Sequence, residues 1–211
     1  MEIKPKTALI LAPHTDDGEF GCGGTVGKLI EQGTQVVYVA FSSADTSLPV
    51  GFAPGTLRNE LYVATAKLGL SPTDTICLDY QVRRFSYSRQ DILDDMLKLK
   101  KKYRPDIVFI PSSYDTHQDH ETIHNEGIRA FKQCTVLGYE APWNNYKFSN
   151  DLFSKLNSSH IELKIEAIGC YKSQNGKDYA SAEYILSLAK SRGVQIGCEF
   201  AECFEVIRVI I

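Results

Sequence analysis

The chain has 211 residues, of which 43 % are hydrophobic and 23 % are charged. This composition can supply a hydrophobic core, which excludes a disordered chain, and the length fits one domain spanning residues 1–211. The net charge is −3, with acidic and basic residues interspersed, so we expect no nucleic-acid partner.

The apolar runs and the cysteines set further limits. No run approaches the ~20 apolar residues that a membrane span needs, and the N-terminal residues do not form a signal-peptide pattern. The six cysteines form no CxxC pair, so a thiolate zinc site is not indicated and reduced cysteines are expected. We therefore expect a cytoplasmic protein without an integral membrane segment, and a homo-oligomer is compatible with the sequence.

Apolar periodicity and turn residues predict strands and helices that alternate along most of the chain. In chain order, the pattern predicts a strand at 7–12, a helix at 25–32, a strand at 35–41, a helix at 57–68, a strand at 75–78, a helix at 90–103, a strand at 107–110, a helix at 120–133, a strand at 136–139, helices at 164–171 and 180–190, and a strand at 204–211. We expect Thr25 to cap its helix, and the side chains of Ile92, Leu93, Met96 and Leu97 to point inward.

This alternation predicts an α/β fold, a Rossmann-like three-layer sandwich with a mostly parallel sheet. In such sheets ligands bind at the carboxyl ends of the strands, near the switch in strand order. Two polar loops, which follow the first and fourth predicted strands, contain most of the histidines and many of the acidic residues. We therefore expect the active site where these two loops meet.

Carboxylates and imidazoles are crowded in both loops. The residues are His14, Asp16, Asp17 and Glu19 in the first loop, and His117, Asp119, His120 and His124 in the second. The three carboxylates of the first loop repel one another unless a cation neutralises them, and an oxygen-and-imidazole set suits zinc or a similar divalent metal. Taken singly, Asp16, Asp17 or Asp119 could merely cap a helix. Capping, however, needs one acidic residue rather than two clusters.

Two short motifs offer other interpretations. The glycines at 21, 23 and 24 suggest a dinucleotide loop, but Val26 stands where GxGxxG requires its third glycine. Residues 120–124 read HETIH, a formal match to the HExxH zinc-peptidase motif, with His120 and His124 as ligands and Glu121 as base. The metallopeptidase alternative would leave the cluster around His14 without a purpose.

Five segments resemble one known family, the LmbE-like (PIG-L) N-acetylglucosaminyl deacetylases. PHTDDGEFGCGGT resembles its AHPDDxExGxGGT loop, and THQDH resembles its HPDH segment. RNELYVATAKLG, KIEAIGCYKSQ and EFAECFEV resemble its Arg-bearing helix, its K..A....SQ segment and its terminal AE.F strand, so the resemblance runs from about residue 7 to 207. Thr15 and Gln118 stand where the family usually has proline, and Arg58 lies two residues before Glu60 where three is usual.

The resemblance implies a metal site formed by His14, Asp17 and His120, which would hold zinc or, as the alternative, Fe²⁺. A catalytic zinc keeps three protein ligands and one open position, which agrees with this set.

The resemblance also implies catalytic roles for three further residues. Asp16 would be the general base, and a protonated His117 would stabilise the oxyanion, with the Asp119 side chain holding its ring. Arg58 is the candidate substrate-binding residue.

The implied reaction is metal-dependent hydrolysis of the N-acetyl group of an N-acetylglucosamine-type sugar derivative, which releases acetate and a free amine. The substrate would be a small-molecule or carrier-linked amino sugar. The alternatives are the HExxH metallopeptidase and a non-catalytic sugar-binding module.

Overall fold

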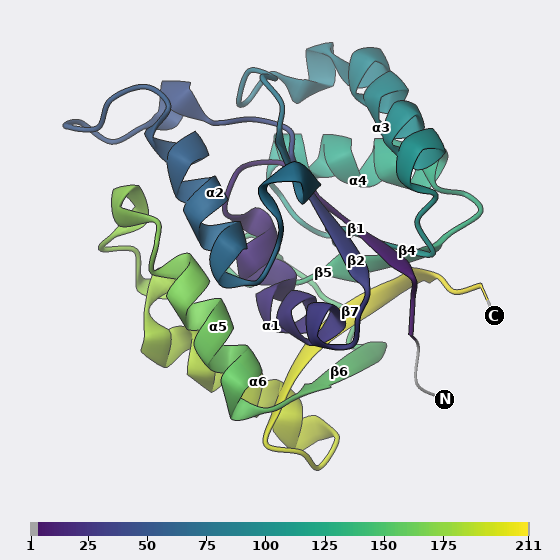
Figure 1. Cartoon of the computed structure of the whole chain (residues 1–211), viewed down its shortest axis with the longest axis vertical. Helices are drawn as coiled ribbons and strands as arrows, with labels where there is room; N and C mark the ends of the chain where they lie inside the picture. The colour runs from purple at the N-terminus through teal and green to yellow at the C-terminus, as the bar shows by residue number, and fades with distance from the viewer. Residues whose placement is uncertain (1–3, 211) are drawn as a thin grey trace.

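The computed structural model describes residues 4–210 and contains, within them, one seven-stranded sheet flanked by helices (Figure 1). The strands are β1 (Thr7–Ala12), β2 (Gln35–Ala40), β3 (Thr75–Cys77), β4 (Ile107–Pro111), β5 (Thr135–Tyr139), β6 (Leu152–Leu156) and β7 (Phe200–Arg208). The helices are α1 (Asp17–Glu31), α2 (Thr56–Lys67), α3 (Arg89–Tyr103), α4 (Gln118–Ala130), α5 (Ser158–Ile168) and α6 (Ala182–Gln195). Short 3-10 turns occupy Asp45–Ser47, Pro72–Asp74, Phe85–Tyr87, Lys172–Gln174 and Asp178–Ala180.

The sheet has the strand order β3-β2-β1-β4-β5-β7-β6. The first five of these strands pair in parallel, whereas β7 pairs antiparallel with both β5 and β6. The chain moves from β1 outward to β2 and β3, and then returns to the other side of β1 with β4. The predicted α/β fold with a mostly parallel sheet is confirmed, and the switch in strand order lies between β1 and β4.

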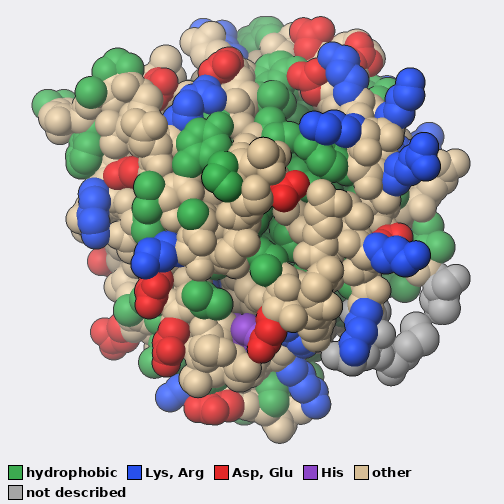
Figure 2. Space-filling model, in the orientation of Figure 1, with side chains coloured by type: hydrophobic (Ala, Val, Ile, Leu, Met, Phe, Trp, Pro, Cys, Tyr) green, Lys and Arg blue, Asp and Glu red, His purple; other side chains and the backbone are tan. Residues whose placement is uncertain are grey.

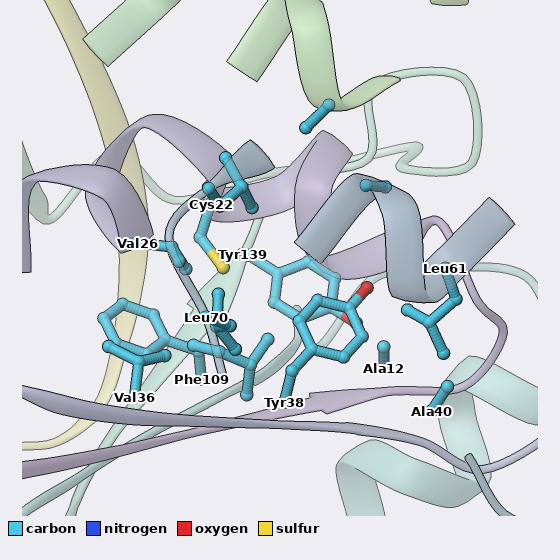
Figure 3. Packing of buried hydrophobic residues seen from close by; sticks show 14 of the residues in the cluster. Ala12, Cys22, Val26, Val36, Tyr38, Ala40, Leu61, Leu70, Phe109 and Tyr139 are labelled. Carbon is cyan, nitrogen blue, oxygen red and sulfur yellow. The ribbon is translucent and has the colours of Figure 1, made fainter. Parts of the chain in front are cut away.

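Helices cover both faces of this sheet, which makes three layers (Figure 1). Ala8 and Ile10 of β1 belong to the core shared with α1 and α2, while Leu9 and Leu11 face the core shared with α3 and α4. This strict alternation, with both faces buried, is typical of parallel strands. In the first core, Cys22 and Val26 of α1 point toward the aromatic and aliphatic side chains that stand on the strands (Figure 3).

Helix α1 begins earlier than the sequence predicts. It starts at Asp17 rather than at Thr25, and it includes the glycines that favour a loop by propensity. These glycines are required by close packing, because a Cβ at Gly21 would lie 2.3 Å from the Tyr139 ring and a Cβ at Gly18 would lie 2.5 Å from the Tyr38 ring. Tertiary contact with the strands therefore overrides helix propensity here.

A break at Cys22 divides α1, because its φ of −148° is not helical. A buried ion pair bonds to the backbone on both sides of this break. Lys164 Nζ donates to the carbonyl of Phe20 at 2.6 Å and to Glu202 Oε1 at 2.7 Å. The Glu202 carboxylate accepts the backbone N–H groups of Gly24 and Thr25 at 3.0 and 2.7 Å. The predicted cap at Thr25 is thus wrong: Glu202 caps the second half of the helix.

The structure also differs from the prediction in which residues of α3 face inward and in the bounds of several elements. Leu97 is 44 % exposed, and Leu99 takes the inward position that the sequence assigns to Leu97. Strand β6 was not predicted, α5 begins at Ser158 rather than 164, and β7 begins at Phe200 rather than 204. Ile211, the last residue of the predicted final strand, lies outside the described residues.

The surface carries charges of both signs. Figure 2 shows Lys and Arg side chains gathered on the side where Figure 1 places α3, the helix that carries exposed Lys98, Lys101 and Lys102. Between residues 4 and 210, none of the helices combines the length and the apolar character that crossing a bilayer requires.

Candidate active site

The polar loops that follow β1 and β4 meet at the carboxyl ends of these two paired strands. His14 lies two residues beyond β1, and Asp17 begins α1. In the second loop, His117 is the residue that caps α4, which begins at Gln118. A cavity of about 240 Å³ opens between the loops and is lined by residues of both. Its position at the switch in strand order is the one that this class of sheet uses for ligands.

Three potential metal ligands converge at the base of this cavity. His14 Nδ1 and His120 Nε2 lie 3.1 and 3.2 Å from Asp17 Oδ2, and the ligand atoms of the three residues all lie within 4.8 Å of one another. In a tetrahedral zinc site with bonds of ~2.0–2.1 Å, neighbouring ligand atoms sit about 3.3 Å apart. The donor types and their spacing therefore fit a zinc ion, and the role of these residues as metal ligands stays a prediction.

In both His14 and His120, the ring nitrogen that does not face Asp17 lies within hydrogen-bond distance of a second carboxylate. Asp119 Oδ2 lies 3.0 Å from His14 Nε2, and Asp115 Oδ2 lies 2.7 Å from His120 Nδ1. Such carboxylate–histidine contacts fix the orientation and the tautomer of metal-binding rings and make them better ligands. Asp115 was missed by the sequence interpretation, although its place two residues before His117 was a usable signal.

The neighbouring carboxylates determine the protonation of the His14 and His120 rings. Burial opposes charge on both rings, but Asp17 and the hydrogen-bonded carboxylates raise the pKa of His14 to about 9 and that of His120 to about 10. Burial also opposes ionisation of Asp17, yet His120 and His14 hold its pKa well below the usual range. Without a metal, protons on the rings therefore supply the positive charge that a divalent cation would bring.

His117 and Asp119 lie beside this cluster, but not as the sequence predicts. The Asp119 carboxylate contacts His14 and accepts the backbone N–H of Arg83 at 2.6 Å, so it does not hold the His117 ring. The ring is instead held by the backbone N–H of Asp119, which donates to His117 Nδ1 at 3.2 Å. The ligand atoms of His14, His117 and Asp119 also lie within 4.8 Å of one another, but the Asp119 carboxylate is already engaged.

His117 is neutral rather than protonated. Burial, together with the neighbouring rings of His120 and His14, lowers its pKa to about 4. Because Nδ1 accepts a hydrogen bond, the proton of the neutral ring sits on Nε2. In the metal-free protein His117 therefore offers one N–H donor at the cavity, whereas the resemblance implies an imidazolium.

Asp16 immediately precedes α1 and lines the cavity. Its side chain makes no capping hydrogen bond, so the capping alternative for this residue is wrong. Burial and the negative charge of Asp17 raise the pKa of Asp16 to about 6. A carboxylate that makes no capping hydrogen bond, is partly protected from water and has a pKa near neutral pH has the properties of a general base.

Glu19 does not join the metal cluster. It is fully buried, and its carboxylate bonds the hydroxyl groups of Tyr38 and, at 2.8 Å, Tyr171. Burial raises the pKa of Glu19 to about 8. The same two hydroxyl oxygens lie 2.9 and 2.7 Å from the carbonyl oxygen of Thr15, so this network packs behind Thr15, between His14 and Asp16.

Arg58 lies outside the site. Its guanidinium group donates to the carbonyl of Cys77 at 2.8 Å and forms an ion pair with Asp79. It is not among the residues that line the cavity, whereas the neighbouring Leu57 is. The structure therefore does not bring Arg58 to the substrate position that the sequence resemblance implies.

The HETIH residues do not form a peptidase site. His124 Nδ1 donates to the carbonyl of Pro111 at 2.8 Å, and its Nε2 faces Ser113 Oγ at 3.4 Å. Glu121 is exposed to solvent, and within residues 4–210 no potential metal cluster includes His124. The metallopeptidase alternative is therefore wrong.

Aromatic side chains form the wall of the cavity above the cluster. The rings of Trp143 and Tyr179 stack at 4.2 Å with an angle of 13°, and the edge of Phe20 meets both at 5.1 and 5.5 Å. Lys177 and Arg83 also line the cavity. The sequence interpretation identified none of these residues as part of the site, because they come from segments that are far apart in the chain.

Comparison with known proteins identifies the family of this chain. The sequence model of the family PIG-L, described as GlcNAc-PI de-N-acetylase, matches residues 9–131, which is more than half of the chain. A diacetylchitobiose deacetylase from Thermococcus kodakarensis is 25 % identical over 220 residues, covering 93 % of this chain and 81 % of the relative.

Two solved structures share the fold. The N,N'-diacetylchitobiose deacetylase from Pyrococcus horikoshii superposes with a TM-score of 0.80 at 24 % identity, over 96 % of this chain and 84 % of the other. GalB, the 4-carboxy-2-hydroxymuconate hydratase from Pseudomonas putida, superposes with a TM-score of 0.79 at 20 % identity, over 98 % of each chain. Because the fold therefore occurs in both a deacetylase and a hydratase, the family is assigned on the sequence match: the chain belongs to the PIG-L family and is a deacetylase of that family.

Proposed function

We propose that this chain hydrolyses the N-acetyl group of an N-acetylglucosamine-type sugar derivative and releases acetate and a free amine. The observation that carries the proposal is the juxtaposition of a zinc-compatible triad, His14, Asp17 and His120, with the uncommitted carboxylate of Asp16 in one cavity. Amide hydrolysis needs an electrophile for the carbonyl and a base for the water, and these residues would provide both. We assign the activity to a single domain, residues 1–211.

His14, Asp17 and His120 would hold the metal. Zinc suits two imidazoles and one carboxylate with an open fourth position, and Fe²⁺ accepts the same ligands. When bound, the metal supplies Lewis acidity toward the acetyl carbonyl and lowers the pKa of the attacking water toward ~7. Asp119 and Asp115 orient the two rings from outside the cluster.

Asp16 acts as the general base and then as the general acid. It accepts a proton from the attacking water and delivers it to the nitrogen of the departing amine, so no net proton is left on the protein. Its pKa of about 6 lets the carboxylate be ionised at neutral pH and still hold a proton transiently.

His117 donates its Nε2–H to the oxygen that becomes negative in the tetrahedral intermediate. A neutral imidazole can perform this role, because a preorganised donor in a site that excludes water stabilises developing charge. The backbone N–H of Asp119 keeps the donor on the correct nitrogen.

The sugar part of the proposal rests on the family and on the cavity. A relative is named as a diacetylchitobiose deacetylase, and the cavity of this chain combines an aromatic wall with a few polar groups. Apolar and aromatic surfaces with a few convergent polar groups are typical of small-molecule sites. The substrate would be a free or carrier-linked amino sugar.

The experiment is a screen for acetate release by protein loaded with Zn²⁺ or Fe²⁺, over N-acetylglucosamine and its glycosides, phosphates and carrier conjugates. We expect metal-dependent acetate release from at least one N-acetylhexosamine derivative, and none after chelation. Release of acetate only from acetylated peptides or simple amides, and from no sugar, would contradict the proposal.

A further inference from the structure

Two cationic residues line the cavity above the metal cluster, and both are exposed to solvent. Arg83 comes from the segment between β3 and α3, and Lys177 comes from the segment between α5 and α6. Among the described residues, the acidic ones that line this cavity are Asp16 and Asp17, which the proposed reaction uses as the base and as a metal ligand. The two cations are therefore open to a ligand that enters the cavity.

Neither cation pairs with a carboxylate in the described part of the chain. The guanidinium group of Arg83 makes no hydrogen bond and no ion pair with any residue between 4 and 210. Lys177 Nζ lies 5.5 Å from the centroid of the Tyr179 ring, and no carboxylate of the same residues lies within ion-pair distance of it. Arginine binds carboxylates and phosphates through its planar fork of N–H donors, so the unpaired guanidinium group suits an oxyanion.

The backbone of Arg83 is held beside the metal cluster in an unusual conformation. Its φ of 64° lies in the left-handed region, which residues other than glycine rarely adopt. Asp119 Oδ2 accepts the backbone N–H of Arg83 at 2.6 Å, and the same oxygen lies 3.0 Å from His14 Nε2. Ala44, which also has a positive φ of 52°, lines the same cavity. Such conformations cluster at ligand-binding sites, so the placement of Arg83 has a functional explanation.

The next residue in the chain, Arg84, is a second arginine in a different setting. Arg84 is also exposed, but it is not among the residues that line the cavity. Its guanidinium carbon lies 5.4 Å from the centroid of the Tyr87 ring, and its φ of −128° is not in the left-handed region. The two adjacent arginines therefore differ in their access to the cavity, and Arg84 provides a matched control for Arg83.

We infer that the substrate carries an oxyanion, a phosphate or a carboxylate, close to its N-acetylated sugar ring, and that Arg83 binds this group. Lys177 adds a second positive charge to the same cavity. This inference rests on the proposed function and deepens it, because it states that the substrate is an acidic amino-sugar derivative rather than a neutral one. Arg83 is then a specificity-determining residue, distinct from the groups that bind the metal or transfer protons.

The test compares wild type with Arg83→Gln, which removes the charge, with Arg83→Lys, which keeps it, and with the control Arg84→Gln. Each metal-loaded protein is assayed for kcat/KM on N-acetylglucosamine phosphates, on the carboxymethyl glycoside of N-acetylglucosamine and on the uncharged ethyl glycoside. We expect wild type and Arg84→Gln to prefer one class of anionic substrate over the ethyl glycoside by about 10- to 100-fold, because hydrogen bonds to charged groups contribute that much. Arg83→Gln should lose this preference, and Arg83→Lys should keep part of it. The preferred anionic substrate shows whether the oxyanion is a phosphate or a carboxylate.

A binding measurement separates this inference from the proposed reaction. Calorimetric titration of the same proteins with glucosamine phosphates, the carboxymethyl glycoside of glucosamine and its uncharged ethyl glycoside needs no turnover. Metal stoichiometry and the melting temperature show whether Arg83→Gln is correctly folded. If that variant fails to fold, Arg83→Asn provides the same comparison, because asparagine tolerates the left-handed backbone better than most residues.

Each outcome decides between the two claims. A preference for anionic ligands in binding that Arg83→Gln abolishes, without acetate release from any sugar, would support the role of Arg83 and contradict the proposed reaction. Acetate release without an anionic preference in wild type, or with the same preference in Arg83→Gln, would overturn the role of Arg83 and leave the reaction standing. Equal losses of kcat/KM on charged and uncharged substrates in Arg83→Gln would overturn it as well. The absence of both sugar binding and acetate release in wild type would overturn both claims.

Discussion

The carboxylate of Asp115 lies 2.7 Å from Nδ1 of His120, and the other nitrogen of the same ring faces Asp17. Asp115→Asn keeps the shape of the side chain but removes the charge that raises the basicity of the ring. We expect zinc affinity to fall about 10- to 100-fold, as measured by chelator competition. The control is Glu121→Gln, a substitution of an exposed residue on α4, the helix that carries His120; it should leave the zinc affinity unchanged. Equal affinities for wild type and Asp115→Asn would mean that Asp115 does not support the metal site.

Substitution of His14, a proposed metal ligand, and of His124, which lies outside the cluster, should affect the zinc content of the protein differently. His14→Ala removes a ligand and should lose most of the bound zinc. His124→Ala should retain near-normal zinc, because His124 bonds to Pro111 and Ser113 and does not face the cluster. Metal analysis after exhaustive dialysis measures both. Loss of zinc in His124→Ala with retention in His14→Ala would restore the peptidase interpretation.

Metal affinity should rise with pH. Although burial opposes charge on the rings, Asp17 and their hydrogen-bonded partners raise the pKa of His14 to about 9 and of His120 to about 10 in the metal-free protein. Zinc must displace these protons, so the apparent affinity should increase by up to ~100-fold per pH unit between pH 7 and 9 if both are released. Competition titrations at several pH values measure this slope. An affinity that is constant over this range would contradict the assignment of the two rings as ligands.

The same shifts fix the sign of the pH effect on the metal-free fold. The folded-state pKa values lie above the unfolded value of about 6.5, so charged rings contribute stability that is fully present below pH 6.5. That contribution is lost as the pH rises toward about 9 and 10. In chelator, the melting temperature of wild type should therefore fall over this range by more than that of His14→Ala.

The buried pair at the break in α1 should be strongly coupled. Lys164→Met leaves the Glu202 carboxylate buried without its cation, which should destabilise the protein by about 3–5 kcal/mol. Adding Glu202→Gln removes the stranded charge and keeps an acceptor oxygen for one of the two N–H groups of Gly24 and Thr25, so the double variant should recover part of the loss. Urea unfolding in chelator measures this cycle, with Lys101→Met in exposed Lys101 of α3 as a surface control. Additive effects of the two substitutions would show that the pair does not act as a unit.

Local pattern was enough to predict the layered fold and the meeting of the two loops. Buried apolar runs such as Thr7–Ala12 and Ile107–Pro111 identify parallel strands, and the topology of such sheets brings the residues that follow them to one edge. The meeting of the two polar loops could therefore be predicted from topology, whereas the choice of His14, Asp17 and His120 within them came from the family resemblance.

What could not be predicted depends on partners that are distant in the chain. The glycines at the start of α1 are poor helix formers, and only the approach of Tyr38 and Tyr139 explains them. Arg58 forms an ion pair with Asp79 instead of lining the cavity. The Asp119 carboxylate contacts His14, although His117 is closer to it in sequence. Helical spacing was also misassigned for Leu97, which lies one step off the row formed by Ile92, Met96 and Leu99.

The central claim is that Asp16 is the base and its neighbour Asp17 is a metal ligand. The direct measurement is zinc per chain and deacetylation rate for Asp16→Asn and Asp17→Asn. Asp16→Asn should bind one zinc per chain and lose about 10²–10⁴ in rate, because the amide cannot accept the proton of the water. Asp17→Asn should lose most of its zinc, because a neutral amide replaces an anionic ligand. Near-wild-type turnover by Asp16→Asn, or full zinc occupancy in Asp17→Asn, would contradict the account.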